Sequence, residues 1–394
     1  MKPITDKQLP PHAPLHVALI GYGAAGRVFH APLIAGVPGL HLACIVTRQV
    51  DAVQRDWPAV RCVATVGAVL ADPAIDLVVI ATPNDSHFEL ARAALLAGKH
   101  VVVDKPCTVT LAETDALLEL ASQQGRVLTV FQNRRFDSDF LALQQVIASG
   151  QLGRVVQLDS HFDRYRPTVP VRWREQNLPG SGLWFDLGPH LLDQALVLFG
   201  QPDALLLEQA KVRDGALVND WFHAVLRYDT PQGGLRVLLH ASTLVAEPGP
   251  RWCVHGTQGS FTKLGLDPQE DALKAGQRPQ LAALADWGHD PQPGQLLHMA
   301  SMAGVAAPVS VRCAAPQPPG NYLAYYAQLR DHLLGLQPEP GVTAEHVRAV
   351  MRWLTLGAES AASGCFMVPD RLGSEHAPFG RGRCASGLTR KVSS

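Results

Sequence analysis

Two groups of residues in this 394-residue chain could move protons or stabilise charge. The first is Asp104-Lys105-Pro106, which follows an apolar, strand-like run. Because proline disfavours helical geometry at the residue before it, Lys105 is expected to be extended at the end of that strand. From there its ammonium group could polarise a substrate oxygen and lower the pKa of an alcohol. The alternative interpretation is a solvated surface lysine.

The second group is Asp186 and His190, in the glycine-rich segment 179–190. Pro189 suits the first position of a helix that ends before Gly200, so His190 is expected in the first turn. The positive end of the helix dipole would lower the pKa of His190 there and keep the ring neutral, as a general base must be. Asp186 could orient this ring or bond a substrate hydroxyl. A capping carboxylate and a structural histidine are the alternatives.

Metal ligation is another chemistry that these residue types could support. Asp186, His190 and Asp193 could bind an ion, but no further cluster of His, Cys or Glu at ligand spacing accompanies them. The sequence therefore predicts no metal site. His223 and His240 fall in strand-like runs and are expected to be structural.

A glycine-rich turn near the N-terminus could bind the phosphates of a dinucleotide. The apolar run before it leads directly into Gly21-Tyr22-Gly23-Ala24-Ala25-Gly26 and a helix-compatible segment. In such a motif Gly21 allows the tight turn, Gly23 admits the pyrophosphate, and Gly26 lets the helix pack close to the strand. The phosphates would then lie at the helix N-terminus, where free N–H groups favour negative charge.

The residues after the second strand predict which dinucleotide is bound. That strand, Leu40–Val46, is followed by Thr47-Arg48, where an acidic residue would hold the ribose 2′-hydroxyl of NAD. A hydroxyl and a guanidinium suit a 2′-phosphate instead, because arginine binds phosphate in a bidentate geometry. We therefore expect NADP as the cofactor. NAD, with a merely solvated Arg48, is the alternative.

Strands and helices alternate over residues 16–131, a pattern typical of a parallel sheet. The elements expected after the glycine turn are strands Leu40–Val46, Ile75–Ala81, His100–Val103 and Arg126–Phe131, and helix Leu111–Gln123. Ligands of such sheets bind outside the carboxyl ends of the strands. One crevice is therefore expected to be lined by Gly21, Arg48, Pro83, Lys105 and Asn133. Gly180 and Gly182 would let the backbone pass close to a cofactor ring there.

From Val155 the pattern changes to successive strand-like runs separated by glycine turns. The runs are Val155–Ser160, Phe222–Arg227, Leu235–Ser242, Arg251–His255 and Ser260–Lys263, and helices are expected at Tyr322–Gly335 and Thr343–Ser363. This succession predicts a largely antiparallel, open sheet in an α+β domain. The α/β chain is thus expected to comprise an N-terminal extension (1–14), a Rossmann domain (15–135), the α+β domain (136–369) and a polar tail (370–394).

Composition argues against several classes of partner. The formal net charge of −1 favours neither nucleic acid nor a membrane surface. No apolar run approaches the roughly 18 residues of a membrane span. The seven cysteines include no C-x-x-C pair, which predicts reduced thiols and a cytoplasmic protein. An open sheet face would be a liability if left bare, so a homo-oligomer, either dimer or tetramer, is expected.

Between His16 and Pro369 the motifs together resemble the Gfo/Idh/MocA oxidoreductase family, the glucose–fructose oxidoreductase and inositol dehydrogenase group. The matching motifs are Gly21-Tyr22-Gly23 with Gly26, Thr82-Pro83-Asn84 with His87, Asp104-Lys105-Pro106, Gln132-Asn133-Arg134-Arg135-Phe136, and Asp186-x-Gly188-x-His190. The family's lysine motif usually begins with glutamate. Here it begins with the shorter Asp104, which leaves Lys105 and Pro106 in place.

Three further stretches resemble NADP-dependent scyllo-inositol dehydrogenases and their relatives: Arg27–Leu33, Arg172–Glu175 and Gly265–Glu270. The resemblance implies hydride transfer between a secondary alcohol of a cyclic polyol or sugar and NADP. It also implies that His190 takes the hydroxyl proton, Lys105 stabilises the alkoxide, and Asp186 positions His190. The alternatives are an aldose, dihydrodiol or keto-sugar as substrate, and a non-catalytic, dinucleotide-sensing regulator.

The candidate site residues fall into three sets. The catalytic candidates are Lys105, Asp186 and His190. The cofactor-binding candidates are Gly21, Tyr22, Gly23, Ala24, Ala25, Gly26, Thr47, Arg48, Thr82, Pro83, Asn84, His87, Asp104, Lys105 and Asn133. The substrate-binding candidates are Lys105, Asn133, Arg134, Asp163, Arg174, Asp186 and His190.

Overall fold

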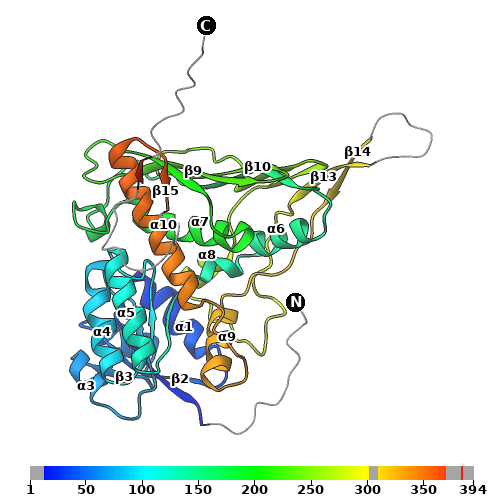
Figure 1. The fold of residues 1–394 in the computed structure, drawn as a ribbon. Coiled ribbons are helices and arrows are strands. Elements are labelled where there is room, and N and C mark those ends of the chain that lie inside the picture. The colour runs from blue at the N-terminus through cyan, green and yellow to red at the C-terminus, as the bar shows by residue number, and fades with distance from the viewer. Residues whose placement is uncertain (1–12, 301–308, 370–382, 385–394) are drawn as a thin grey trace.

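The computed structural model describes residues 13–300, 309–369 and 383–384. Within them the chain forms two sheets, each with its own helices, which are the lower and upper parts of Figure 1. Nearly all of the predicted N-terminal extension and polar tail lies outside the described residues.

The lower domain contains a six-stranded parallel sheet in the order β3-β2-β1-β4-β5-β6, the order of a dinucleotide-binding sheet. Its strands are β1 (Leu15–Ile20), β2 (Leu40–Val46), β3 (Arg61–Val63), β4 (Leu77–Ile80), β5 (His100–Val103) and β6 (Leu128–Val130). The central strand β4 is aliphatic and buried throughout, as a sheet covered on both faces requires. The predicted parallel sheet is therefore confirmed. Its strand order reverses between β1 and β4, which is where such sheets bind ligands.

Helices cover this lower sheet. They are η1 (Gly26–His30), α1 (Ala31–Ala35), α2 (Val50–Asp56), α3 (Val66–Leu70), α4 (His87–Leu96) and α5 (Leu111–Gln123). Helix α5 has the predicted bounds, because a reciprocal cap fixes its start: the Thr110 hydroxyl accepts from the Glu113 N–H, and the Glu113 carboxylate accepts from the Thr110 N–H. Helix α9 (Leu323–Leu333) comes from the end of the chain but packs beside α1 (Figure 1), where the Tyr326 hydroxyl lies 2.6 Å from His30 Nδ1.

The upper domain contains a ten-stranded sheet in the order β14-β13-β12-β11-β7-β10-β9-β8-β15-β16. Among its described strands, β7 and β10 pair in parallel and the other neighbours are antiparallel, so the predicted, largely antiparallel sheet is confirmed. Its strands are β7 (Val155–Asp163), β8 (Ala204–Ala210), β9 (Trp221–Thr230), β10 (Gly233–Ser242), β11 (Trp252–Gly256), β12 (Gly259–Lys263), β13 (Gln295–Ala300), β14 (Val309–Ala314), β15 (Met367–Val368) and β16 (Arg383–Cys384).

One face of this upper sheet is packed against helices, and the other is open. The covering helices are α6 (Ser138–Ala148), α7 (Leu183–Phe199) and α10 (Ala344–Ser363), and they lie beneath the sheet in Figure 1. Along β7 the side chains of Leu158 and Phe162 are buried toward the helices, while His161 points to the open face. This alternation follows from the two-residue period of a strand.

Helix α7 differs from the prediction in a way that matters for the site. It begins at Leu183, so Pro189 lies inside it and His190 is not in its first turn. The start is set by Asn219, a residue of a distant loop, whose backbone carbonyl and side-chain oxygen accept from the N–H groups of Leu183 and Trp184. The expectation of a helix beginning at Pro189 is therefore wrong.

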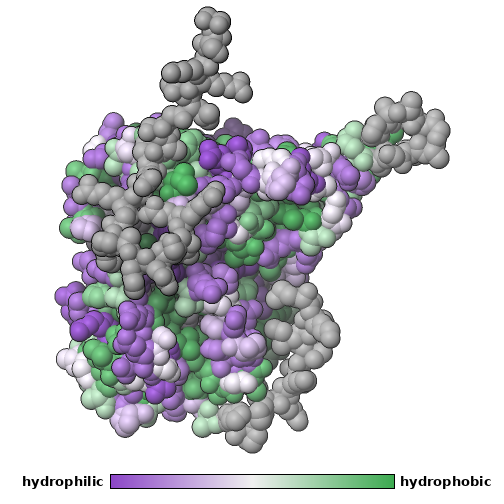
Figure 2. Space-filling view, viewed as in Figure 1, coloured by the Kyte–Doolittle hydropathy of each residue, from purple (hydrophilic) through white to green (hydrophobic). Residues whose placement is uncertain are grey.

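The described cysteines include both free thiols and a bonded one. Cys44, Cys62, Cys107, Cys253 and Cys313 are free, but Cys365 is disulfide-bonded, so the expectation of fully reduced thiols is wrong at that residue. Among the helices that the structure describes, none is both long and apolar enough to cross a membrane. Figure 2 shows hydrophilic residues over much of the visible face, with hydrophobic residues in smaller patches between them.

Candidate active site

Lys105 reaches from the carboxyl end of β5 into the upper domain. Its Nζ donates to the Asp186 carboxylate oxygen Oδ1 at 2.7 Å and to the Asp186 backbone carbonyl at 2.5 Å. The backbone N–H of Lys105 donates to Asp104 Oδ1 at 2.8 Å, which fixes the loop. Lys105 is buried, and burial lowers its pKa against the opposing effect of the Asp186 carboxylate. Lys105 thus stands at the end of the strand, bound to a carboxylate.

Asp186 lies in the first turn of α7 and binds two cations. Besides Lys105, it has the Arg174 Nε 3.6 Å from Oδ1. Burial would raise the pKa of Asp186, but Lys105 and then Arg174 hold it well below its usual range. Asp186 is therefore a carboxylate at neutral pH.

His190 lies one turn further along α7 and lines the same cleft as Lys105 and Asp186. Burial holds its pKa well below the ordinary value, and the positive charges of Lys105 and Arg134 lower it further. The expected neutral imidazole is thus favoured, but by burial and not by a helix terminus. Its Nδ1 has no hydrogen-bond partner among the described residues.

The expected pairing of Asp186 with His190 does not match these contacts. The hydrogen bonds and ion pairs of the Asp186 carboxylate go to Lys105 and Arg174. Residues four apart on a helix lie on one face, so Asp186 and His190 share a side of the cleft. The structure therefore shows Asp186 bound to Lys105, and the positioning of His190 by Asp186 stays a prediction.

These residues line a cleft of about 220 Å³ between the two domains. The predicted residues on its wall are Ala24, Ala25, Asp104, Lys105, Asn133, Arg134, Arg174, Asp186 and His190. Arg134 does not project freely into it, because its guanidinium donates to Glu270 Oε2 at 2.5 Å and lies over the Phe162 ring. This cleft brings together the candidates from β5, from η3 (Asn133–Phe136) and from α7.

Several cleft residues were not singled out individually from the sequence. They are Arg164, Arg166, Arg172, Glu270 and Lys274, and the last two lie on α8 (Gln269–Lys274). Burial lowers the pKa of Arg164 to about 10, with Glu270 opposing that effect. The four arginines between residues 164 and 174 were the sequence signal that could have indicated this part of the cleft. Together they make one wall of the cleft rich in hydrogen-bond donors.

The glycine turn lies at the same edge of the lower sheet. Gly21 has a φ of +99°, and a Cβ there would approach the Ala81 carbonyl oxygen to 2.5 Å. A Cβ on Gly26 would collide with the Gly21 carbonyl, which accounts for close packing of helix and strand. A Cβ on Gly23 would meet nothing within 4 Å. The turn therefore fits a pyrophosphate, because there is open space beside Gly23, the glycine that the pyrophosphate would approach.

The neighbouring cofactor candidates lie in different settings. The Tyr22 side chain turns away from the glycine turn and donates to Asp56 Oδ2 at 3.0 Å, so this residue offers only its backbone. Arg48 is exposed directly after β2, and the Thr47 hydroxyl accepts from the Gln49 N–H at 3.0 Å. Arg48 thus has the freedom to meet a phosphate at the sheet edge.

The loop between β4 and α4 is held by protein contacts. The two ring nitrogens of His87 lie 2.9 Å from the Pro106 carbonyl and 3.0 Å from the Thr82 carbonyl, so this buried ring joins the two loops. Asn84, which follows Pro83, donates to the Gly180 carbonyl at 2.9 Å and thereby connects the two domains. These side chains support the cleft from behind.

Gly180 and Gly182 lie in the turn before α7, and their expected approach to a cofactor ring or substrate stays a prediction. The space beside Gly180 is filled by Asn84, and the space beside Gly182 is filled by Asn219. Their positive φ values, +75° and +89°, fit the turn that starts α7. Both glycines therefore serve this turn.

Two acidic candidates lie apart from the cleft. Asp163 was predicted to contact substrate, but its carboxylate points to the open face of the upper sheet, whereas Phe162 and Arg164 on either side of it point toward the cleft pockets. Asp193, weighed as a metal ligand, is bound by the Arg135 guanidinium through bonds of 2.6 and 2.7 Å. A bidentate bond to arginine accounts for this carboxylate.

Comparison with known proteins places this geometry in context. Residues 15–132 match the family described as "Oxidoreductase family, NAD-binding Rossmann fold", and residues 144–368 match "Oxidoreductase family, C-terminal alpha/beta domain", the two Gfo/Idh/MocA domains. The chain is 51% identical over 348 residues to the uncharacterized oxidoreductase YdgJ of Escherichia coli, covering 88% of this chain and 96% of YdgJ.

Two further relatives are informative. The scyllo-inositol 2-dehydrogenase (NADP(+)) IolW of Bacillus subtilis is 36% identical over 347 residues, covering 88% of this chain and 94% of IolW. The solved structure of YPO2259 from Yersinia pestis is 50% identical with a TM-score of 0.82, covering 89% of this chain and 96% of that one. With both domains matched and these relatives spanning nearly their full lengths, the chain belongs to the Gfo/Idh/MocA oxidoreductase family and is a dehydrogenase or reductase.

Proposed function

We propose that this enzyme transfers hydride between a secondary alcohol of a cyclic polyol or sugar, of the scyllo-inositol type, and NADP. The observation that carries the proposal is Lys105, fixed by Asp186, facing the same cleft as a neutral His190 and opening toward the glycine turn. The similarity to IolW, a scyllo-inositol 2-dehydrogenase (NADP(+)), supports the same function.

The bound nicotinamide would supply or accept the hydride, and the protein would handle the proton and the charge. His190, neutral in its buried site, accepts the hydroxyl proton as the alcohol is oxidised. Lys105 donates to the substrate oxygen and stabilises the negative charge that develops there. Asp186 and its backbone carbonyl keep the ammonium group oriented toward the cleft.

Substrate hydroxyl groups would meet a wall of donors. Asn133 and Arg174 line the cleft next to Lys105, and Arg164 and Arg166 extend the wall. Guanidinium groups carry several donors in a fixed plane, which suits the equatorial oxygens of a polyol ring. An aldose, a dihydrodiol or a keto-sugar presents similar oxygens, so these remain the alternative substrates within the same chemistry.

NADP is proposed over NAD because of the end of β2. Arg48 is exposed there, and Thr47 adds a hydroxyl beside it. An arginine beside the adenosine ribose suits a 2′-phosphate in NADP-binding sheets of this type. We further propose a cytoplasmic enzyme that associates through the open face of its upper sheet as a dimer or tetramer.

The proposal is tested by following the reduced-nicotinamide absorbance band. The purified chain is incubated with a panel of inositols, hexoses, dihydrodiols and keto-sugars, each with NADP and with NAD. Turnover of a cyclic polyol with NADP and a clear preference over NAD is expected. Cofactor binding without turnover of any compound would instead favour the regulator, and equal use of NAD would refute the role given to Arg48.

A further inference from the structure

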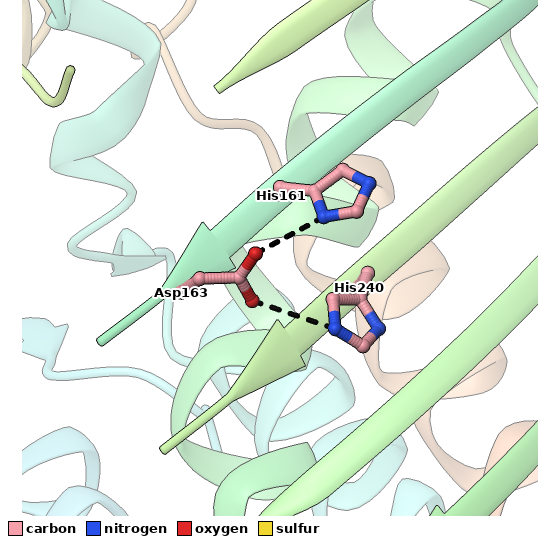
Figure 3. Close-up of side chains that lie close together, drawn as sticks. All are labelled: His161, Asp163 and His240. Atoms are coloured by element: carbon pink, nitrogen blue, oxygen red, sulfur yellow. Dashed lines mark hydrogen bonds and ion pairs between the residues drawn. The ribbon is translucent and has the colours of Figure 1, made fainter. Parts of the chain in front are cut away.

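Three polar side chains on the open face of the upper sheet form a cluster outside the cleft. They are His161 and Asp163 on β7 and His240 on β10, and Figure 3 shows both rings turned toward the carboxylate. His161 Nδ1 lies 3.1 Å from Asp163 Oδ2, and His240 Nε2 lies 3.5 Å from Asp163 Oδ1. One ligand atom from each residue lies within 4.8 Å of the other two.

The register of the sheet produces this cluster. β7 and β10 are parallel neighbours in which His161 is paired with His240, so their rings project side by side from one face. Asp163 is two residues beyond His161 and therefore projects from the same face. The next strand, β9, places His223 opposite His240, with ring centroids 5.8 Å apart. Backbone hydrogen bonds thus hold the three ligands on a rigid surface.

The carboxylate of Asp163 has a feature that hydrogen bonding does not explain. Its side chain is only 6% exposed, yet Oδ1 has no hydrogen-bond partner among the described residues. Buried polar atoms are almost always satisfied, so an unsatisfied one points to a ligand such as an ion. This oxygen faces His240 and the shared space between the two rings.

We propose that His161, Asp163 and His240 form a binding site for a divalent transition metal ion, and that zinc is the ion it binds best. Two imidazoles and one carboxylate are donors that such ions accept. Ligand atoms about 2.0–2.1 Å from a tetrahedral zinc lie about 3.3–3.4 Å from one another. His161 Nδ1 lies 3.1 Å from Asp163 Oδ2 and His240 Nε2 lies 3.5 Å from Asp163 Oδ1, so each nitrogen is near that separation from one oxygen of the carboxylate. Water would complete the coordination.

The site is separate from the proposed hydride transfer. It lies on the face of the sheet opposite the cleft, and it joins the parallel pair of strands, β7 and β10. Metal binding there would cross-link these strands and stabilise the folded chain over the unfolded chain. No ligand spacing in the sequence signals this site, because about eighty residues separate His240 from the other two ligands.

Zinc binding to the full-length protein tests the proposal. Protein treated with a chelator and dialysed is titrated with ZnCl₂ in a calorimeter, and its Tm is measured with and without the metal. We expect about one zinc per chain and a higher Tm with zinc present. His240→Gln and Asp163→Asn should each weaken binding by more than about 100-fold, since even residues behind a metal ligand contribute 10- to 100-fold.

Two matched variants distinguish this site from scattered histidines. His223→Gln removes the adjacent imidazole on the same face, and His289→Gln removes an exposed histidine elsewhere. Both should bind zinc as the unaltered chain does. If His240→Gln folds poorly by circular dichroism, the more exposed ligand is tested with His161→Gln. The proposal is overturned if the unaltered chain takes up no zinc, or if the ligand variants bind it as tightly as the two controls.

Discussion

Replacing Asp186 by asparagine tests whether the buried lysine is held ready by its carboxylate. In the folded protein the side chains of Lys105 and Asp186 are 10% and 20% exposed, and Nζ lies 2.7 Å from Oδ1. Asparagine keeps the size and one carbonyl oxygen but removes the negative charge. Lys105 retains its bond to the backbone carbonyl of residue 186. The variant therefore isolates the contribution of the charge.

The expected effect follows from this geometry. Removing one partner of a buried ion pair costs about 3–5 kcal/mol when the other charge remains. Partial exposure and the remaining backbone bond reduce this, so we expect about 2–3 kcal/mol. If that loss falls on the orientation of Lys105 in the transition state, kcat/KM drops about 30- to 150-fold. Burial lowers the pKa of Lys105 and Asp186 opposes it, so the pKa of Lys105 should fall further in Asp186→Asn.

The assay is steady-state kinetics across a range of pH, with a substrate from the polyol panel and NADP. We expect lower kcat/KM, an alkaline limb that begins at lower pH, and unchanged NADP affinity. Asp115→Asn is the matched control, since it removes a carboxylate whose ion pair with Arg348 is on the surface. The reasoning is refuted if Asp186→Asn keeps more than about half the activity, or if its pH profile does not move.

Three further predictions concern stability and the cofactor. The free energy of unfolding should fall as pH drops from about 6.5 toward 4, because burial lowers the pKa of His30 to about 4 while the unfolded ring binds its proton near 6.5. Calorimetry should then show a shallower decline of Tm in His30→Gln, and an identical decline would contradict the prediction. Arg48→Ala should weaken NADP binding about tenfold and leave NAD binding unchanged, since a charged hydrogen bond contributes about 1.5–3 kcal/mol and Arg48 is exposed. Parallel titrations with the two cofactors check this, and equal losses of affinity would count against a contact with the 2′-phosphate. Gly23→Ala should fold normally, because its Cβ meets only open space, but it should bind cofactor poorly, because the Cβ would occupy the space proposed for the phosphates. Gly21→Ala should instead lower Tm, because its Cβ meets the Ala81 carbonyl. Normal cofactor affinity in Gly23→Ala would contradict the proposed phosphate approach.

Much of the fold could be predicted from the sequence, where local signals agree with the final structure. Strand β5 and helix α5 have their predicted bounds, because an aliphatic run and a capping pair determine them locally. Strands β9 and β10 alternate between buried and half-exposed residues, and the pattern is visible in the sequence. Strand β14 was not predicted: its apolar and polar residues alternate over only five positions, and all of its residues are exposed. Its pairing with β13 depends on the register of the whole sheet.

The residues of the candidate site could be predicted from the sequence, but many of their contacts could not. Lys105, Asp186 and His190 line one cleft, as expected from strand ends and motif. The ion pair of Asp186 with Lys105 was not predicted, because it joins side chains that are eighty-one residues apart and come from different domains. Asp163 was misplaced for a simpler reason. A shift of one residue along a strand moves a side chain to the other face, and the neighbours of Asp163 are the ones that point toward the cleft.

Orienting Lys105 and keeping His190 neutral depend on different contacts in this cleft. Lys105 is kept oriented by Asp186 and by the backbone of α7, while His190 stays neutral through burial and the nearby positive charges. A protonated His190 would add a third positive charge beside Lys105 and Arg134, so these two cations keep the imidazole neutral and able to accept a proton. The same positive charges attract the negative charge of a developing alkoxide. Changes at Asp186 should therefore act first on the charge at Lys105. Asp186 also raises the pKa of His190, so removing its charge should lower that pKa too, and the acidic limb of the pH profile should move to lower pH together with the alkaline limb.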